Sequence, residues 1–425
     1  MDKQDDKQER VIPKLRFPEF QTTLGWKPSS ISKTCRSFSG GTPNTANKHF
    51  YGGKIPFIRS AEIALEKTEL FLTEEGLNNS SAKMVNKGDV LVALYGANSG
   101  NVALSKIDGA INQAILCLQH QNNNAFLYHF LSYNQEKIVN TYIQGGQGNL
   151  SGEIIKSIKL PFPSPKEQQK IADCLSSIDE LIELQEQKLA ALKQHKKGLM
   201  QQLFPSHNDL QASKQASTQA SKQAIVYPKL RFPQFKDCKG WEVVELEELF
   251  DLTIQNEKAN SFDKDKIITV KLHTLGVVKN ERTDTLTGGA NYFHRKAGDF
   301  IFSKIDFLNG AFGIVPNELD GFCSSSDIPS FSFKPESNAN FFMYWLKANY
   351  LDFKIERAGT SNTLKRISPK ALFAMQLPIP LPEEQQAIAD CLSSLDKLIS
   401  EENEQIGRLK DHKKGLMQQL FPKIQ

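Results

Sequence analysis

Apolar side chains recur at steps of three and four residues in two long segments of this chain. Pro165 and Pro382 stand just ahead of the segments, where proline suits the first turn of a helix, and Phe-Pro ends both. The steps match the a and d positions of a heptad, so each segment is predicted to be a long helix with one apolar seam. The seam residues are Ile171, Leu175, Ile178, Ile182, Leu189, Leu192, Leu199 and Leu203 in the first segment, and Ile388, Leu392, Leu395, Ile399, Ile406, Leu409, Leu416 and Leu420 in the second.

A helix with such a seam needs a surface against which to bury it. We expect the two seams to bury each other as an intramolecular coiled coil. An antiparallel pairing is favoured because it gives a pseudo-two-fold axis and places the rest of each half at opposite ends. The alternative is that each helix packs only on its neighbouring domain.

The remaining sequence predicts mixed α/β (α+β) domains. Short apolar runs such as DVLVALY at 89–95 and DFIFSKI at 299–305 are typical of strands. The longer stretches at 124–143 and 338–356 have the spacing of amphipathic helices.

The chain is an internal duplication. Glu167–Pro205 and Glu384–Pro422 share 26 of 39 residues, and the entry motif PKLRFPEF at 13–20 returns as PKLRFPQF at 228–235, each time followed by Gly-Trp. The sequences between entry motif and helix share only faint similarity, as between 87–104 and 297–314. Conserved repeats with divergent sequences between them are expected when the two domains are selected for different ligands. The alternative is that the sequences between the repeats drifted apart after the duplication.

The predicted organisation therefore has five parts. They are a first globular domain with its entry motif at 1–163, a conserved spacer helix at 164–205, a Gln/Ala/Ser/Lys linker at 206–226, a second globular domain at 227–380 and a second spacer helix at 381–425. The repeat QASKQASTQASKQA at 211–224 is compatible with a flexible linker and with a helical extension, and both stay open.

Composition and charge narrow the class of protein. No apolar run reaches the length of a membrane span, and the charged N-terminus lacks the apolar core of a signal peptide, so we expect a cytoplasmic protein with no membrane contact. Residues 10–163 carry 16 basic and 10 acidic side chains, against 20 and 19 in residues 227–380. The mildly basic first half permits binding of nucleic acid.

The sequence offers no catalytic or metal-binding signature. The six cysteines form no CxxC and no Cys/His cluster with metal spacing, and there is no phosphate-binding G-x-x-x-x-G-K-[ST] loop. The Asn/Asp-Pro-Pro-aromatic motif of amino-methyltransferases is absent as well. We expect a non-catalytic protein without cofactors of its own.

Two divergent domains, each followed by a nearly identical helix that opens with EQQ-x-IA, resemble the specificity subunit of a Type I restriction–modification enzyme. SGGTPNTANKHFYGGKIPFIRSAEI at 39–63 is similar to the start of a target recognition domain in that family, whereas the second domain lacks the GGTP element. The resemblance implies two target recognition domains that read the two parts of a bipartite double-stranded DNA target. It also implies two methyltransferase subunits as partners, restriction/translocase subunits in the restricting complex, and S-adenosylmethionine, ATP and Mg²⁺ bound on those partners.

Candidate DNA-binding residues stand in polar, glycine-rich loops. Arg and Lys suit guanine, Asn and Gln suit adenine, and Ser and Thr suit either base. The candidates are Thr42, Asn44, Lys48, Arg59, Tyr95, Asn98, Ser99, Gln147 and Asn149 in the first domain, and His294, Arg295, Lys304, Asn309, Thr360, Ser361, Asn362 and Lys365 in the second.

Two other functions are compatible with the pattern. One is an interaction scaffold that carries two ligand modules on a coiled coil and binds no DNA. The other is a fused enzyme such as a nuclease, against which the missing motifs count. The bases recognised and the spacer length between half-sites do not follow from the sequence.

Overall fold

The computed structural model describes residues 10–143, 150–206, 208–213, 224–254, 256–261, 263–282, 291–355 and 365–422. Two helices of 39 residues dominate it, α5 (Pro165–Leu203) and α9 (Pro382–Leu420). The chain divides into two compact units, one made of residues 1–187 with 402–425 and the other of residues 188–401. Each long helix therefore contributes to both units, and the five-part division made from the sequence stays a prediction.

The first unit holds a small α/β domain. Its strands form three sheets, with the orders β2-β9-β6-β7, β4-β3-β8-β5 and β1-β10. The strands are β1 (Lys27–Ser30), β2 (Cys35–Ser39), β3 (Tyr51–Ile58), β4 (Leu70–Leu72), β5 (Lys83–Val85), β6 (Val90–Ala93), β7 (Val102–Leu104), β8 (Gly109–Ile111), β9 (Ile115–His120) and β10 (Lys159–Phe162), and the helices are α1 (Ile31–Thr34), α2 (Glu74–Asn78), α3 (Asn124–Ile143) and α4 (Gly152–Ser157).

The second unit repeats part of this frame. The sheet β17-β16-β19 has the pairing of β7-β6-β9, and β12 pairs with β20 as β1 pairs with β10. Its strands are β11 (Ile225–Val226), β12 (Trp241–Glu245), β13 (Ile268–Val270), β14 (Val277–Lys279), β15 (Tyr292–His294), β16 (Phe300–Phe302), β17 (Phe312–Ile314), β18 (Cys323–Ser325), β19 (Ser330–Phe331) and β20 (Gln376–Ile379), and its helices are α7 (Ala339–Asn349) and α8 (Pro369–Phe373).

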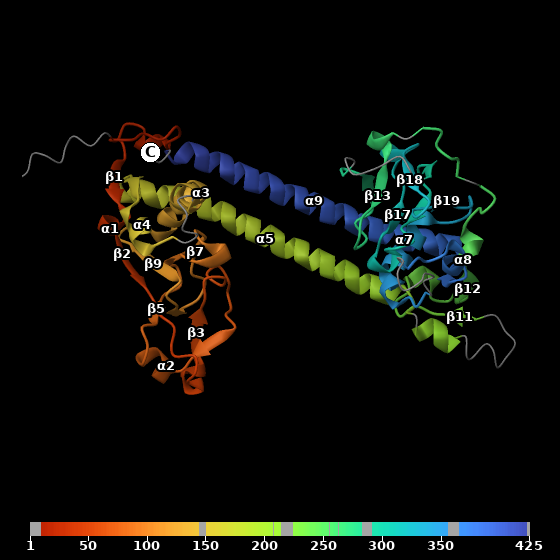
Figure 1. Ribbon diagram of the computed structural model, residues 1–425, viewed down its shortest axis with the longest axis horizontal. Helices are drawn as coiled ribbons and strands as arrows, with labels where there is room; N and C mark the ends of the chain where they lie inside the picture. The colour runs from red at the N-terminus through yellow and green to blue at the C-terminus, as the bar shows by residue number, and fades with distance from the viewer. Residues whose placement is uncertain are drawn as a thin grey trace, which may run out of the picture. The chain divides into compact units, whose positions relative to one another are not determined.

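The weak similarity between 87–104 and 297–314 reflects this common frame. Gly88 and Gly298 both adopt a positive φ, 91° and 85°, in the turn that opens β6 and β16. The fold class predicted from the sequence is confirmed, with two mixed α/β domains and two long helices in contact (Figure 1).

The two long helices pair antiparallel along the predicted seam. In the first unit the Lys413 ammonium lies 2.5 Å from the Asp179 carboxylate, and the Lys410 ammonium lies 2.6 Å from the Glu186 carboxylate. The partner number rises as the lysine number falls, which defines the antiparallel direction. In the second unit the Lys196 ammonium lies 2.5 Å from the Asp396 carboxylate of the other helix. The seam residues of both helices are buried or half-buried, while most other positions are exposed.

Each helix end completes a hydrophobic core. In the first unit Leu420 and Phe421, at the end of α9, lie in the core built around Trp26 and α3. The Phe421 ring stacks on Phe130 with 4.6 Å between centroids. In the second unit Leu203 and Phe204, at the end of α5, join the core around Trp241 and α7.

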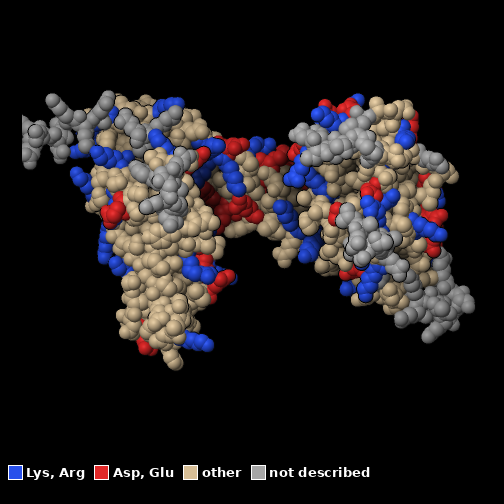
Figure 2. All heavy atoms as spheres, viewed as in Figure 1, with Lys and Arg blue, Asp and Glu red and all other residues tan. Residues whose placement is uncertain are grey.

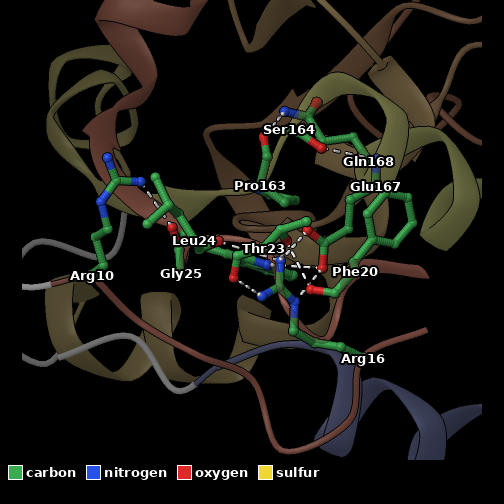
Figure 3. A network of polar contacts seen from close by, with 11 residues as sticks. Arg10, Arg16, Phe20, Thr23, Leu24, Gly25, Pro163, Ser164, Glu167 and Gln168 are labelled. Carbon is green, nitrogen blue, oxygen red and sulfur yellow. Dashed lines mark hydrogen bonds and ion pairs between the residues drawn. The ribbon is translucent and has the colours of Figure 1, made fainter. Parts of the chain in front are cut away.

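Each entry motif fastens the start of one helix to the end of the other. In the first unit the Arg16 guanidinium donates to both carboxylate oxygens of Glu167 at 2.8 and 2.6 Å, with both side chains buried (Figure 3). The Leu15 amide donates to the carbonyl of Gln419 at 3.0 Å. In the second unit Arg231 binds Glu384 in the same bidentate way, at 2.7 and 2.6 Å.

The end of α9 is therefore expected to stabilise the first unit and the end of α5 the second. Removing a buried phenylalanine ring costs about 3–5 kcal/mol. Phe421→Ala should accelerate amide hydrogen exchange in α3, with little change in α7, and Phe204→Ala should do the reverse. Exchange measured by mass spectrometry on both variants checks this; faster exchange in α7 on Phe421→Ala would contradict the assignment of the helix ends.

Candidate nucleic-acid interface

Polar loops of the first unit gather at one edge of the sheet β2-β9-β6-β7. β2 ends at Ser39 beside Leu116, and β6 ends at Ala93 beside Ile115, where β9 begins. Because β9 runs antiparallel to both, the ends of β2 and β6 lie at the same edge. The loops that leave this edge carry the candidates Thr42, Tyr95, Asn98 and Ser99.

Hydrogen bonds fix these loops to one another. The Thr42 hydroxyl donates to the side-chain carbonyl of Gln113 at 2.6 Å, and both side chains are exposed. The Ser99 hydroxyl and the Leu150 amide both donate to the carbonyl of Leu94, each at 2.9 Å. Ser99 therefore holds its own loop, whereas Tyr95, with 41% of its surface exposed, is accessible to a ligand.

Arg59 follows β3 of the sheet β4-β3-β8-β5, close to these loops, and is already paired. β3 and β8 run parallel with Ile58 beside Ile111, so Arg59 lies next to the turn that carries Gln113. Its guanidinium donates to Glu62 at 3.0 and 2.8 Å and to Glu69 at 2.5 Å. Burial raises the pKa of Glu62, but the hydrogen bonds from Arg59, the Glu69 amide and Thr68 together outweigh burial and lower that pKa to about 2. Arg59 thus braces the turn after β3. We call Thr42, Arg59, Tyr95, Asn98 and Gln113 the first edge cluster.

The second unit presents a different set of side chains at the equivalent edge. The Lys304 amide, just after β16, donates to the carbonyl of Asp327 at 2.8 Å, and the Lys304 carbonyl accepts from Ile367 at 2.8 Å. Arg366 donates to both carboxylate oxygens of Asp327 at 2.8 and 2.9 Å. Asn309, on the loop after β16, and Lys365, next to Arg366, both have exposed side chains. We call Lys304, Asn309, Asp327, Lys365 and Arg366 the second edge cluster.

The candidate Arg295 is buried, which counts against the predicted DNA contact. Only 2% of its surface is exposed, and its guanidinium donates to the hydroxyl of Ser324 at 2.6 Å and to backbone carbonyls. Burial lowers the pKa of Arg295 to about 10. The side chain braces the segment after β15 against β18.

Other candidates lie away from the edge clusters or outside the described residues. His294 is exposed but stands before β16, at the sheet edge opposite to Lys304. Lys48 precedes β3, whereas Arg59 follows it. The Asn44 side chain accepts a hydrogen bond from the Ala46 amide within its own turn. Gln147, Asn149, Thr360, Ser361 and Asn362 fall outside the described residues.

The structure also adds residues that the sequence pattern did not single out. Gln113 stands in INQA, immediately before the buried strand β9, so a polar pair at the start of an apolar run was its only signal. The Asp327–Arg366 pair joins residues 39 positions apart, which no local pattern shows.

The long helix α5 carries a row of acidic side chains beside the first domain. In the first unit a groove of about 1030 Å³ runs between α5 and the domain and is lined by Asp179, Glu180, Glu183 and Glu186. Acidic side chains on α5 are visible in Figure 2. Lysines balance most of these charges, since Asp179 pairs with Lys413, Glu183 with Lys106 and Glu186 with Lys410. This helix face therefore offers little net positive charge to phosphate groups, which makes it a poor DNA-binding element.

Within the part of the chain that the structure describes, no group of three His, Cys, Asp or Glu side chains could hold a metal ion. No helix among the described residues is long and apolar enough to cross a membrane.

Comparison with known proteins places this architecture in a family. The family described as Type I restriction modification DNA specificity domain matches residues 24–194 and 238–410, one match in each half. The MjaVIII specificity subunit of Methanocaldococcus jannaschii is 24% identical over 423 residues, which cover 96% of this chain and 93% of that protein. The EcoR124I/EcoR124II specificity subunit of Escherichia coli is 25% identical over 178 residues, 39% of this chain and 43% of that protein.

Solved structures share the fold. The S subunit of a Type I restriction–modification system from M. genitalium superposes with a TM-score of 0.59 at 16% identity, covering 98% of this chain and all of that chain. A chain from a study of complex assembly and conformational transition in the type I system reaches 0.51 at 16% identity and covers 94% of this chain and 98% of that chain. With the family match in both halves, these findings show that the chain belongs to the DNA specificity subunits of Type I restriction–modification systems, with two target recognition domains and no catalytic role of its own.

Proposed function

We propose that the two edge clusters read the two half-sites of one bipartite double-stranded DNA target. The observation that carries the proposal is the difference between the clusters on a shared frame. At the same sheet edge the first domain offers Thr42, Tyr95 and Gln113, and the second offers Lys304, Asn309 and Arg366. These side chains supply the donors and acceptors that distinguish base edges in the major groove.

Backbone hydrogen bonds hold the loops of each cluster in place, which suits recognition of a ligand with a fixed shape such as a DNA duplex. The Leu150 amide ties its segment to Leu94, and the Ile367 amide ties the corresponding segment to Lys304. Each half thus holds several loops at fixed positions beside one sheet edge. A site preorganised in this way discriminates between bases without first paying for loop ordering.

A second part of the proposal concerns protein partners. We propose two methyltransferase subunits per chain, with restriction/translocase subunits joining them, and S-adenosylmethionine, ATP and Mg²⁺ bound on those partners. The support is a stripe of exposed residues that is identical in both repeats. It runs Gln169–Asp173–Ser177–Leu181 on α5 and Gln386–Asp390–Ser394–Leu398 on α9, with a spacing of four residues that places each stripe on one helix face.

The stripe has the same internal contacts in both copies. The side-chain amide of Gln169 donates to the carboxylate of Asp173 at 2.6 Å, and that of Gln386 donates to the carboxylate of Asp390 at 2.7 Å. Leu181 and Leu398 are exposed by 47% and 46%. Packing of the two helices does not require their solvent-facing residues to be identical in the two copies. In the next part of each helix, residues 183–191 differ from residues 400–408 at all nine positions. An exposed surface kept identical twice, beside helix segments that diverged, fits one kind of partner docking once on each half.

The first test exchanges one domain. Residues 21–163 are replaced by the corresponding domain of a related specificity subunit, and methylated adenines are mapped across the genome of cells that express the complex. One half of the methylated sequence should change and the other should stay intact, because the frame and the second edge cluster are untouched. A change in both halves of the methylated sequence would contradict independent recognition by the two domains. If a gel-shift assay of the purified complex with its methyltransferase subunits showed no DNA binding, the scaffold function would be favoured.

The second test removes the repeated leucines. Leu181→Ser with Leu398→Ser should lower the number of methyltransferase subunits retained in native mass spectrometry from two per chain towards none, while each single variant should retain about one. The matched control is Leu184→Ser, because Leu184 is 62% exposed but stands opposite Glu401 in the repeat.

The outcomes separate docking from general damage. Unchanged stoichiometry in the double variant, or equal loss in Leu184→Ser, would refute the stripe as the docking surface. A wild-type complex with one methyltransferase per chain would refute symmetric docking itself.

A further inference from the structure

A strained hairpin borders the second edge cluster. β13 and β14 pair in register from Ile268 with Lys279 to Val270 with Val277, and the loop Lys271–Gly276 joins them. Two consecutive residues of this loop, His273 and Thr274, have φ angles of 57° and 58°. Non-glycine residues seldom adopt this left-handed conformation, and a β-branched threonine there is an outlier. Such strain persists only where surrounding contacts impose it.

The contacts that impose it come from the loop after β16. The His273 amide donates to the carbonyl of Asn309 at 2.8 Å, and the Thr274 amide donates to the carbonyl of Gly310 at 2.9 Å. Gly310 leaves room for this approach, since a Cβ there would lie 2.8 Å from the Thr274 nitrogen. The hairpin tip is therefore held against the backbone that carries Asn309 of the second edge cluster.

The side chains at this tip point to a ligand outside the fold. Lys271 and His273 are exposed, as are 41% of Leu272 and 68% of Leu275. These apolar and cationic side chains lie in solvent, so the strained tip contributes little to the hydrophobic core of the second domain. A two-stranded β-ribbon fits the major groove of DNA. There an imidazole N–H or a lysine ammonium can donate to guanine, and an apolar side chain can contact the thymine methyl group.

The hairpin is also where the two domains depart from their common frame. Ile267 lies parallel to Cys323 in the second unit, as Phe57 lies parallel to Ala110 in the first. In the first domain the antiparallel pairing of β3 with β4 ends at Phe57 and Leu70, and the chain between them turns through Arg59 and Glu62, whereas in the second the pairing of β13 with β14 continues to Val270 and Val277. The divergence thus falls at the sheet edge that the proposed function assigns to DNA reading.

We infer that the Lys271–Gly276 hairpin enters the major groove of the second half-site and that His273 is a specificity-determining residue there. This inference rests on the proposed function, because it requires the second domain to read duplex DNA. It adds a recognition element that lies outside the loops expected from the sequence.

The test uses the full chain in complex with its methyltransferase subunits and a genome-wide map of methylated adenines. His273→Ala should relax the preference at one position of the second half-site by about tenfold, the scale of one lost base contact. The first half-site and the spacer length should be unchanged. An unaltered second half-site in His273→Ala would overturn the assignment of that residue.

A glycine pair tests the docking of the hairpin. Gly310→Ala adds a Cβ that collides with the tip, whereas Gly321→Ala imposes a similar left-handed strain, at φ 73° against 79°, with no neighbour within 4 Å. Gly310→Ala should degrade discrimination at several positions of the second half-site, and Gly321→Ala should preserve it. Equal behaviour of the two variants would overturn the role of hairpin docking.

A third variant distinguishes failure of this inference from failure of the proposed function. Lys304→Ala with Asn309→Ala alters the second edge cluster and leaves the hairpin side chains intact. If this variant changes the second half-site and both hairpin variants do not, the hairpin inference is wrong and the proposed function stands. If none of the variants changes it, the assignment of DNA reading to this edge is wrong as well.

Discussion

The burial of the two apolar seams is the constraint on which the rest of this structure depends. A helix of 39 residues with an apolar face needs a partner of matching length, and the chain supplies one by repeating the helix. Antiparallel pairing then brings the end of each helix to the start of the other. Leu420 and Phe421 complete the core of the first unit, and Leu203 and Phe204 complete that of the second. Neither recognition domain is complete without residues from the other half of the sequence.

Polar interactions make this pairing specific. Lys196 stands in the heptad position between Leu192 and Leu199, and Lys413 stands in the position between Leu409 and Leu416. Each binds an aspartate of the facing helix within its own unit. A polar residue in an apolar seam disfavours registers in which it lacks its partner. The buried Arg16–Glu167 pair acts in the same sense, because an uncompensated buried charge costs about 3–5 kcal/mol. These pairs therefore select one arrangement rather than adding much net stability.

The sequence predicted the parts of the fold that follow from periodicity and repetition. The seams, the mixed α/β domains and the common frame were all visible because spacing and internal identity are local or countable signals. The site was less accessible. Arg295 has the chemistry of a base-reading residue, but only the tertiary structure reveals that Ser324 and neighbouring carbonyls bury it. Gln113 and the Asp327–Arg366 pair reach their edges through strand pairing over long separations. The left-handed conformation of His273 and Thr274 breaks the local preference of those residue types, so no sequence pattern announces it.

The central claim is that two different recognition domains on one repeated frame read two different half-sites. The most direct measurement is the methylation map of cells that express the unaltered chain with the proposed methyltransferase partner, obtained by a sequencing method that detects N6-methyladenine. The account predicts one bipartite motif with two unlike half-sites, a fixed unread spacer and one methylated adenine in each half. A contiguous motif, or two identical half-sites related by symmetry, would contradict it.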